Sequence, residues 1–132
     1  MSAGPFPPIV YDAGALVAAE RGDRRLRTLH DQALLARTTI LVPAPVVAQA
    51  WRNGAKQARL SRLLDGCTIT PTDEEVAKAA GVLLCASRTS DVVDAIVVVT
   101  ALPLGALVFT SDADDLNKLA HAANAELELV PV

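Results

Sequence analysis

The chain has 132 residues, 52% of them hydrophobic, which suffices for one domain with a substantial core. Its aromatic content of only 3% argues against a base-stacking platform of the kind that binds single-stranded nucleic acid. A net charge of −3 gives no general attraction for nucleic acid, so phosphate binding would need a local basic patch or a metal ion.

The first half of the chain predicts three strands separated by helices. Residues 9–11 form a short apolar strand, and the Ala-rich segment 13–20 that follows Asp12 is typical of a helix that ends at Gly22. A helical repeat of apolar residues covers 24–37, and the strand 39–42 ends at Pro43. Helices are predicted over 45–51 and 56–64, before a third strand at 67–70.

The second half predicts three more helices and two more strands. Thr72-Asp73-Glu74-Glu75 matches a capping box, which predicts a helix to about Ala86. A helix opened by Ser90-Asp91 contains Asp94 and ends at Gly105, and residues 107–110 form a strand. The last helix covers 113–123 and the last strand 126–130.

Strands and helices therefore alternate five times with short connections and no internal linker. This pattern predicts an α/β fold, a three-layer α/β/α sandwich around a parallel five-stranded sheet, with residues 1–132 as a single domain. The start, Met1 to Pro8, has no charged signal region, and the longest apolar stretch, 92–104, is interrupted and too short for a bilayer. Cytoplasmic localisation without membrane contact is expected. Cys67 and Cys85 fit no zinc spacing and are expected to be reduced core thiols.

Three acidic positions recur at equivalent places in this pattern. Asp12 follows the first strand, Asp94 lies in the first turn of a helix, and Asp112 follows the fourth strand. Ligands of parallel sheets bind beyond the carboxyl ends of the strands, so these groups are expected to converge there. Carboxylates repel one another unless a cation compensates them, and oxygen ligands suit Mg²⁺ or Mn²⁺. A capping role for Ser111 or Asp112 in the last helix is the alternative.

Four motifs in this order resemble the PIN domain, and specifically the VapC-type toxin ribonucleases of bacterial toxin–antitoxin pairs. The resemblance covers essentially the whole chain, and its motifs are Val10-Tyr11-Asp12-Ala13-Gly14-Ala15-Leu16, Val42 to Arg52, Asp94-Ala95-Ile96-Val97 and Thr110-Ser111-Asp112-Ala113-Asp114-Asp115-Leu116. The resemblance implies a PIN-like fold and a metal-dependent endoribonuclease that hydrolyses RNA. It also implies a homodimer that is silenced by a cognate antitoxin protein wrapped over the active-site groove.

The resemblance assigns site residues one by one. It implies that Asp12, Asp94 and Asp112 hold the metal and that Asp115 contributes to catalysis. Gln49 stands where the family usually carries a glutamate, and an amide adds no negative charge and cannot act as a base. This departure supports an alternative, a catalytically weakened PIN domain that binds RNA or an antitoxin.

Other polar residues have two open readings each. Thr110 and Ser111 could orient Asp12 or Asp112 and meet RNA, or only cap the strand end. Arg52 and Lys56, with Arg59 and Arg62, are expected on consecutive turns beside Gln49, either on an RNA backbone or on a solvated helix face.

Four further residues have minor roles at the expected site or none. Glu20 could substitute for the missing carboxylate or lie in solvent near Arg24, and Asp91 could support the metal or cap its helix. His30 and His121 lack partner ligands and receive no catalytic role.

A receiver-type signalling domain is the other fold to consider. It also has an acidic Mg²⁺ pocket, but it needs an Asp after a central strand and a Lys after the last one. Here the third strand ends at Thr70-Pro71 and no Lys follows the final strand, so the receiver is rejected. The Leu- and Ala-rich helices at 24–37 and 56–64 are expected to offer apolar surface to a second copy or to an amphipathic antitoxin helix.

Overall fold

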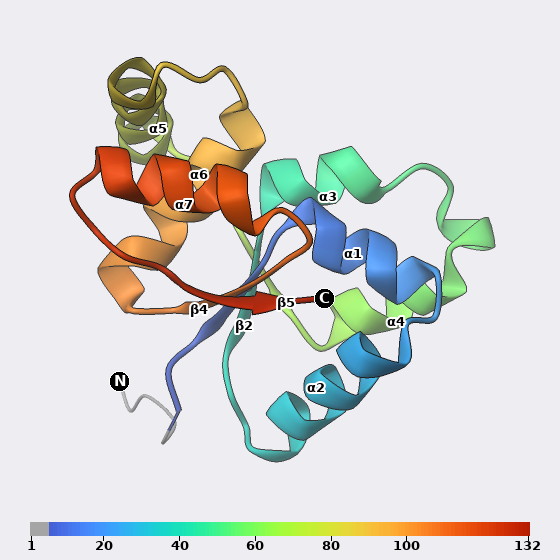
Figure 1. Cartoon of the computed structure of the whole chain (residues 1–132). Helices are drawn as coiled ribbons and strands as arrows, with labels where there is room; N and C mark the ends of the chain where they lie inside the picture. Colours follow the sequence, from blue (N-terminus) through green and yellow to red (C-terminus); the bar gives the residue numbers. More distant parts are fainter. Residues whose placement is uncertain (1–5) are drawn as a thin grey trace.

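A parallel five-stranded sheet forms the centre of the computed structural model, which describes residues 6–132 (Figure 1). Its strand order is β3-β2-β1-β4-β5, and all four pairings are parallel. The strands are β1 (Ile9–Tyr11), β2 (Ile40–Pro43), β3 (Thr68–Thr70), β4 (Leu107–Thr110) and β5 (Glu128–Pro131). The α/β sandwich predicted from the sequence is therefore confirmed. The expectations for Met1 to Pro5 lie outside the described residues.

Seven α-helices and two short 3₁₀ helices connect these strands within residues 6–132. The α-helices are α1 (Ala13–Glu20), α2 (Arg24–Leu35), α3 (Ala44–Ala50), α4 (Ala58–Asp65), α5 (Glu74–Ser87), α6 (Val92–Ala101) and α7 (Ala113–Ala122). The 3₁₀ helices are η1 (Gly54–Lys56) and η2 (Leu102–Leu104). No helix in this part of the chain is both long and apolar enough to cross a membrane.

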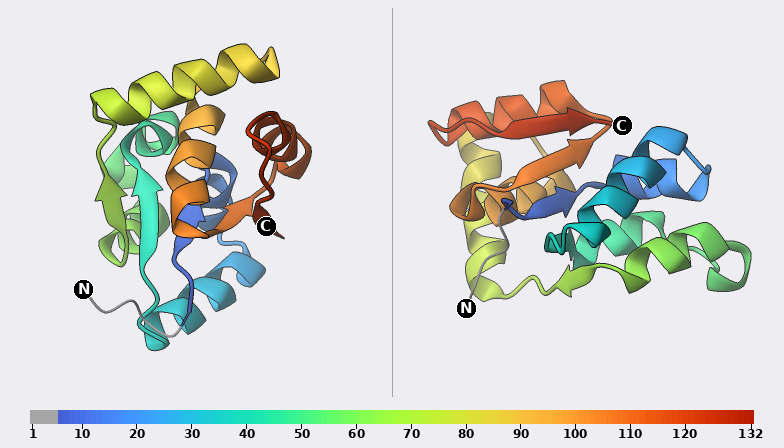
Figure 2. Two further views of the ribbon diagram at one scale, coloured as in Figure 1. Left: turned by 90° about the vertical axis from the view of Figure 1, so that its left-hand side faces the viewer. Right: turned by 90° about the horizontal axis from the view of Figure 1, so that it is seen from below.

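The helices form a layer on each face of the sheet. In Figure 1, α6 and α7 lie above the sheet and α2 and α4 below it, and α1 packs on β1 and β4 and against α2 and α4. Helix α5 contacts α6 and α7 and runs across the end of α6 (Figure 2). The chain leaves β1 toward β2 but returns to β4 on the other side of β1. The carboxyl ends of β1 and β4 are therefore the switch point at which such sheets bind ligands.

Burial explains why a valine-rich segment forms a helix at α6. Its sequence VVDAIVVVTA contains β-branched residues that favour strands, but Ala95 to Val98 are all buried between the sheet and the outer helices. The helix ends through Pro103 in η2 and through Gly105, whose φ of +58° suits glycine. Tertiary packing thus overrides local propensity here.

The helix starts and the thiols differ in detail from the sequence expectations. The cap of α5 is Asp73, whose carboxylate accepts the Val76 N–H at 2.9 Å, and not Thr72 of the expected capping box. The segment expected as one helix from Lys56 begins at Ala58, because the 3₁₀ turn η1 precedes it. Cys67 is half-buried, but Cys85 is exposed on α5, so the expectation of a core thiol was wrong for Cys85.

Candidate metal centre

The acidic positions converge at the switch point of the sheet. Asp12 follows β1 directly, and its N–H donates to the carbonyl of Phe109 on β4 at 3.1 Å. Asp112 lies two residues beyond β4, at the start of α7, and Asp94 lies in the first turn of α6. The parallel pairing of β1 with β4 therefore brings together segments that are about 100 residues apart in sequence.

Three carboxylates form a compact group. One oxygen from each of Asp94, Asp112 and Asp115 lies within 4.8 Å of the other two. Asp94 is half-buried, and the other two are exposed on the first turns of α7. The Asp112 carboxylate caps no N–H of α7, so the alternative reading of Asp112 as a simple helix cap fails. Oxygen donors at this spacing suit Mg²⁺ or Mn²⁺.

Asp12 lies beside this group rather than in it. Its carboxylate is 3% exposed and accepts the Ala15 N–H at 2.9 Å, which caps α1. Burial raises the pKa of Asp12, and hydrogen bonds from the Thr110 hydroxyl and from backbone N–H groups oppose that rise. The sequence led us to expect Asp12 together with Asp94 and Asp112, and the observed group has a different third member. Asp115 completes the compact group, and Asp12 is a hydrogen-bonded neighbour.

The carboxylates strongly perturb one another. Burial first, then the charges of Asp91, Asp112, Asp12 and Asp115, raises the pKa of Asp94 to about 7. The pKa of Asp112 is raised by desolvation, by a hydrogen bond with Asp115, and by neighbouring negative charges. A bound cation would remove this repulsion, because it stabilises all the ionised forms together.

Thr110 connects two of the acidic residues. Its hydroxyl accepts the backbone N–H of Asp112 at 2.8 Å and also hydrogen-bonds the Asp12 carboxylate. Thr110 is therefore in contact with the residues it was expected to orient, and its orienting role stays a prediction. Thr110 is only 1% exposed, so its side chain cannot meet an RNA strand directly.

Gly14 is a site residue that the sequence analysis missed as such. It lies in the first turn of α1, and a Cβ there would come within 1.9 Å of the Ser111 Oγ and 2.8 Å of the Ser111 Cβ. Ser111 in turn offers its N–H to the Asp12 carboxylate. Glycine therefore lets α1 approach the β4–α7 connection closely enough to enclose Asp12.

Gln49, Glu20 and Asp91 are not members of the compact carboxylate group. Gln49 is exposed near the C-terminal end of α3. The Glu20 carboxylate accepts the Gln57 side-chain N–H at 3.0 Å. Glu20 therefore neither replaces the missing carboxylate of the pocket nor lies free in solvent near Arg24, the two roles considered for it. Asp91 caps α6 by accepting the Asp94 N–H at 2.9 Å.

The basic residues expected on consecutive turns come from three different elements. Arg52 lies in the loop after α3, where its guanidinium donates to the carbonyls of Ala48 and Trp51 at 3.0 and 2.7 Å. Lys56 is exposed on η1, and Arg59 and Arg62 belong to α4. The expectation of a single helix face was wrong because the loop and η1 interrupt the helical run.

The buried histidine has a structural partner. The Tyr11 hydroxyl lies 2.7 Å from His30 Nδ1, and burial lowers the pKa of His30. Burial also raises the pKa of the Cys67 thiol to about 12, so this thiol remains protonated.

Comparisons with known proteins bear on this geometry. A family model described as PIN domain matches residues 9–122. VapBC2 from Rickettsia felis, solved bound to a DNA fragment from its promoter, has a chain similar in structure at a TM-score of 0.65 and 14% identity. That similarity covers 94% of this chain and 98% of the other. A chain of FitAB bound to the IR36 DNA fragment gives a TM-score of 0.63 at 18% identity, covering 93% and 94%. No curated protein matches the chain in sequence.

We expect Gly14→Ala to destabilise the protein by about 1–3 kcal/mol, because the added methyl group overpacks the contact with Ser111. Chemical denaturation measures this. Gly81→Ala is the matched control, because a Cβ at Gly81 on α5 meets nothing within 4 Å. Combining Gly14→Ala with Ser111→Gly should restore much of the loss, and a destabilised double variant with no recovery would contradict the packing explanation.

The apo protein should lose stability as pH rises from about 4 to 7. The fold raises the pKa of Asp94 from 3.8 to about 7, so between these values the folded state retains a proton that the unfolded state has released. Because Asp94 is half-exposed, the loss is about 1–2 kcal/mol, or about 3–8 °C in Tm.

Asp94→Asn should flatten this pH profile and raise Tm at pH 7 in EDTA. Asp114→Asn is the control, since it removes a carboxylate of α7 that lies outside the group of three. Thermal unfolding from pH 4 to 8 tests the expectation, and an unchanged profile for Asp94→Asn would refute it.

Proposed function

The chain belongs to the PIN domain family, whose members are generally nucleases, and we propose that it is a divalent-metal-dependent endoribonuclease, the toxin of a toxin–antitoxin pair. The observation that carries this proposal is the group of Asp94, Asp112 and Asp115 carboxylates within 4.8 Å at the switch point of the sheet. The similarity to VapBC2 and FitAB chains supports the fold on which this placement depends.

The donor set fits Mg²⁺ or Mn²⁺. Its members are hard carboxylate oxygens, and the raised pKa values of Asp94 and Asp112 record the unbalanced negative charge that a divalent cation would neutralise. When bound, such a cation supplies Lewis acidity toward a phosphate oxygen and toward water. Asp94, Asp112 and Asp115 would hold it, and Asp12 is placed to join them.

The chain's own residues set the geometry of hydrolysis. Thr110 fixes the start of α7 relative to Asp12 through its two hydrogen bonds. The raised pKa of Asp94, about 7, allows this carboxyl group to gain or lose a proton near neutral pH when no cation is bound. Phosphodiester cleavage requires a water molecule and the leaving oxygen to be positioned on opposite sides of phosphorus, and the open, exposed side of Asp112 and Asp115 leaves room for the substrate.

The proposed partner is an antitoxin with an amphipathic helix. A groove of about 290 Å³ runs between α1, α2 and α4, and it is lined by apolar residues such as Leu26, Leu34 and Leu63 together with Arg27, Arg59 and Arg62. An apolar helix face would fit this groove. An antitoxin Arg or Lys could then reach the carboxylates, which explains silencing by charge compensation.

We also propose a homodimer, to which α2 but not α4 of the two helices suggested by the sequence contributes exposed leucines. The expected apolar faces were α2 and α4, but Leu60 and Leu63 of α4 are buried and only α2 leaves leucines outside, with Leu35 86% exposed. Val82 on α5 and Val92 at the start of α6 are also exposed, at 71% and 54%. These side chains supply apolar surface that a second copy would cover.

Gln49 is the feature that favours the second candidate, a weakened PIN domain that binds RNA or an antitoxin without cleaving. An amide on α3 replaces the carboxylate typical of the family, which lowers the negative charge around the cation. The compact group of three aspartates and the intact Asp12 favour the active enzyme instead.

Asp94→Asn should abolish RNA cleavage while the fold is retained. Removing the central charge of the group weakens divalent-ion binding, so Mn²⁺ measured by calorimetry should bind at least about tenfold more weakly. Asp114→Asn should cleave like the wild type. Cleavage by Asp94→Asn at the wild-type rate, or full wild-type cleavage in EDTA, would contradict the metal-dependent mechanism.

Gln49→Glu tests the two candidate functions against each other. A carboxylate at this position adds negative charge beside the pocket, so we expect tighter Mn²⁺ binding and cleavage raised about 10–100-fold. An active wild type with a neutral substitution would make Gln49 a bystander. If neither protein cleaves RNA with Mn²⁺ present, the binding-module function replaces the nuclease.

A further inference from the structure

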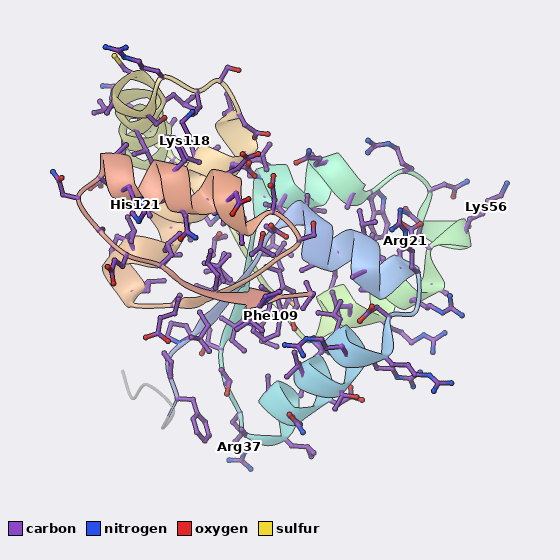
Figure 3. All side chains as sticks on the ribbon, viewed as in Figure 1. Arg21, Arg37, Lys56, Phe109, Lys118 and His121 are labelled. Atoms are coloured by element: carbon purple, nitrogen blue, oxygen red, sulfur yellow. The ribbon has the colours of Figure 1, made fainter. Side chains whose placement is uncertain are left out.

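The charges of the chain are divided between its two halves. Residues 1–66 carry nine of the twelve Lys and Arg residues but only five of the fifteen Asp and Glu residues. The first half contributes α1 to α4, and the second contributes α5 to α7 with most of the acidic residues. In Figure 3, Arg21 and Lys56 of the first half lie at one side of the molecule, and Lys118 and His121 of the second half lie at the other. Although the whole chain has a net charge of −3, its first half therefore carries an excess of positive charge.

The basic residues at this end are free of carboxylate partners. Among residues 6–132 the one ion pair joins Lys78 to Glu74, on α5. Glu20, which contacts the loop after α3, accepts a hydrogen bond from the Gln57 amide at 3.0 Å. Cations without ion pairs on a domain of negative net charge form a local patch of the kind that binds phosphates.

A buried glutamine holds the loop 51–57 at this end in place. The Gln57 Oε1 accepts the N–H groups of Arg52 and Asn53 at 2.8 and 2.9 Å, and its Nε2 donates to the Ala50 carbonyl and to Glu20, both at 3.0 Å. All four hydrogen-bonding positions of the amide are used. The loop is therefore anchored to both α3 and α1, and its exposed side chains project from a fixed backbone.

The loop presents the single tryptophan of the chain. Trp51 follows α3 directly, and the residue is 37% exposed. Its indole lies against Gly54, where a Cβ would come within 2.5 Å of the ring. Glycine at this position thus allows the ring to rest on the loop backbone while part of it stays in solvent.

We propose that Trp51 stacks on one base of a single-stranded RNA, with Lys56 contacting its phosphates. The inference rests on the proposed function for the identity of the nucleic acid. An exposed ring and an exposed lysine on the same loop are the combination used for single strands, because every base has a face to stack on. Helix α3 begins at the carboxyl end of β2 and ends at Ala50, directly before Trp51, and it is about 10 Å long. A short single-stranded RNA lying along α3 would therefore run from Trp51 past Gln49 toward the metal centre.

Tryptophan fluorescence tests the stacking directly, because Trp51 is the only tryptophan. The wild-type protein is titrated in EDTA, where cleavage is blocked, with a single-stranded hexanucleotide of mixed RNA sequence and with the same sequence as a duplex. We expect the single strand to quench the emission and the duplex, whose bases are already stacked, to leave it unchanged. No response to the single strand, or an equal response to the duplex, would overturn the proposal.

Variants separate stacking from packing. Measured by anisotropy of a labelled strand, Trp51→Leu should bind about 5- to 100-fold more weakly, while Trp51→Phe should stay close to the wild type. Thermal unfolding of both variants is the control that they fold. Wild-type affinity in Trp51→Leu would contradict the proposal, and Trp51 would then be left for a protein partner.

The salt dependence of binding tests the phosphate contacts. Lys56→Ala should lower the slope of log affinity against log salt by about 0.7, whereas Lys118→Ala, which removes the same charge from the opposite end, should not change it. Equal slopes for the two variants would overturn the contact.

Because binding is measured without cleavage, quenching by a protein that cuts no RNA would refute the nuclease and support this site. RNA cleavage without quenching would support the nuclease and refute the stacking of RNA on Trp51.

Discussion

Repulsion among carboxylates at one edge of the sheet is the constraint that organises this protein. Asp94, Asp112 and Asp115 are held within 4.8 Å of one another, with Asp12 buried beside them. Such an arrangement destabilises the fold near neutral pH unless a cation or a partner's basic side chain compensates it. In the proposed function, metal binding, catalysis and silencing by an antitoxin would all depend on this negative charge.

The parallel sheet makes this arrangement possible. Because β1 and β4 are neighbours with their carboxyl ends at the same edge, Asp12 and Asp112 meet although about 100 residues separate them. Thr110 fixes their relative position, and Gly14 removes the side chain that would hold α1 away from Ser111. The supporting residues are therefore small or buried, and they leave the outer side of the carboxylates open to a substrate.

The fold and the acidic residues could be predicted from the sequence, because hydrophobic period, strand ends and motif order are local signals. Asp115 rather than Asp12 completes the compact group, because the Asp12 carboxylate is buried and accepts the Ala15 N–H as the cap of α1. Gly14 was visible only as part of a motif, and nothing local reveals that it faces Ser111. Gln57 was missed for the same reason, since a glutamine between two helices reads as exposed until the loop folds over it.

The most direct test of the central claim is a crystal structure of the protein grown with Mn²⁺, with the ion located by its anomalous scattering. The account predicts one strong peak within about 2.0–2.3 Å of carboxylate oxygens of Asp94 and Asp112, with Asp115 or Asp12 adjoining. A peak elsewhere, or none at Mn²⁺ concentrations that support cleavage, would contradict it.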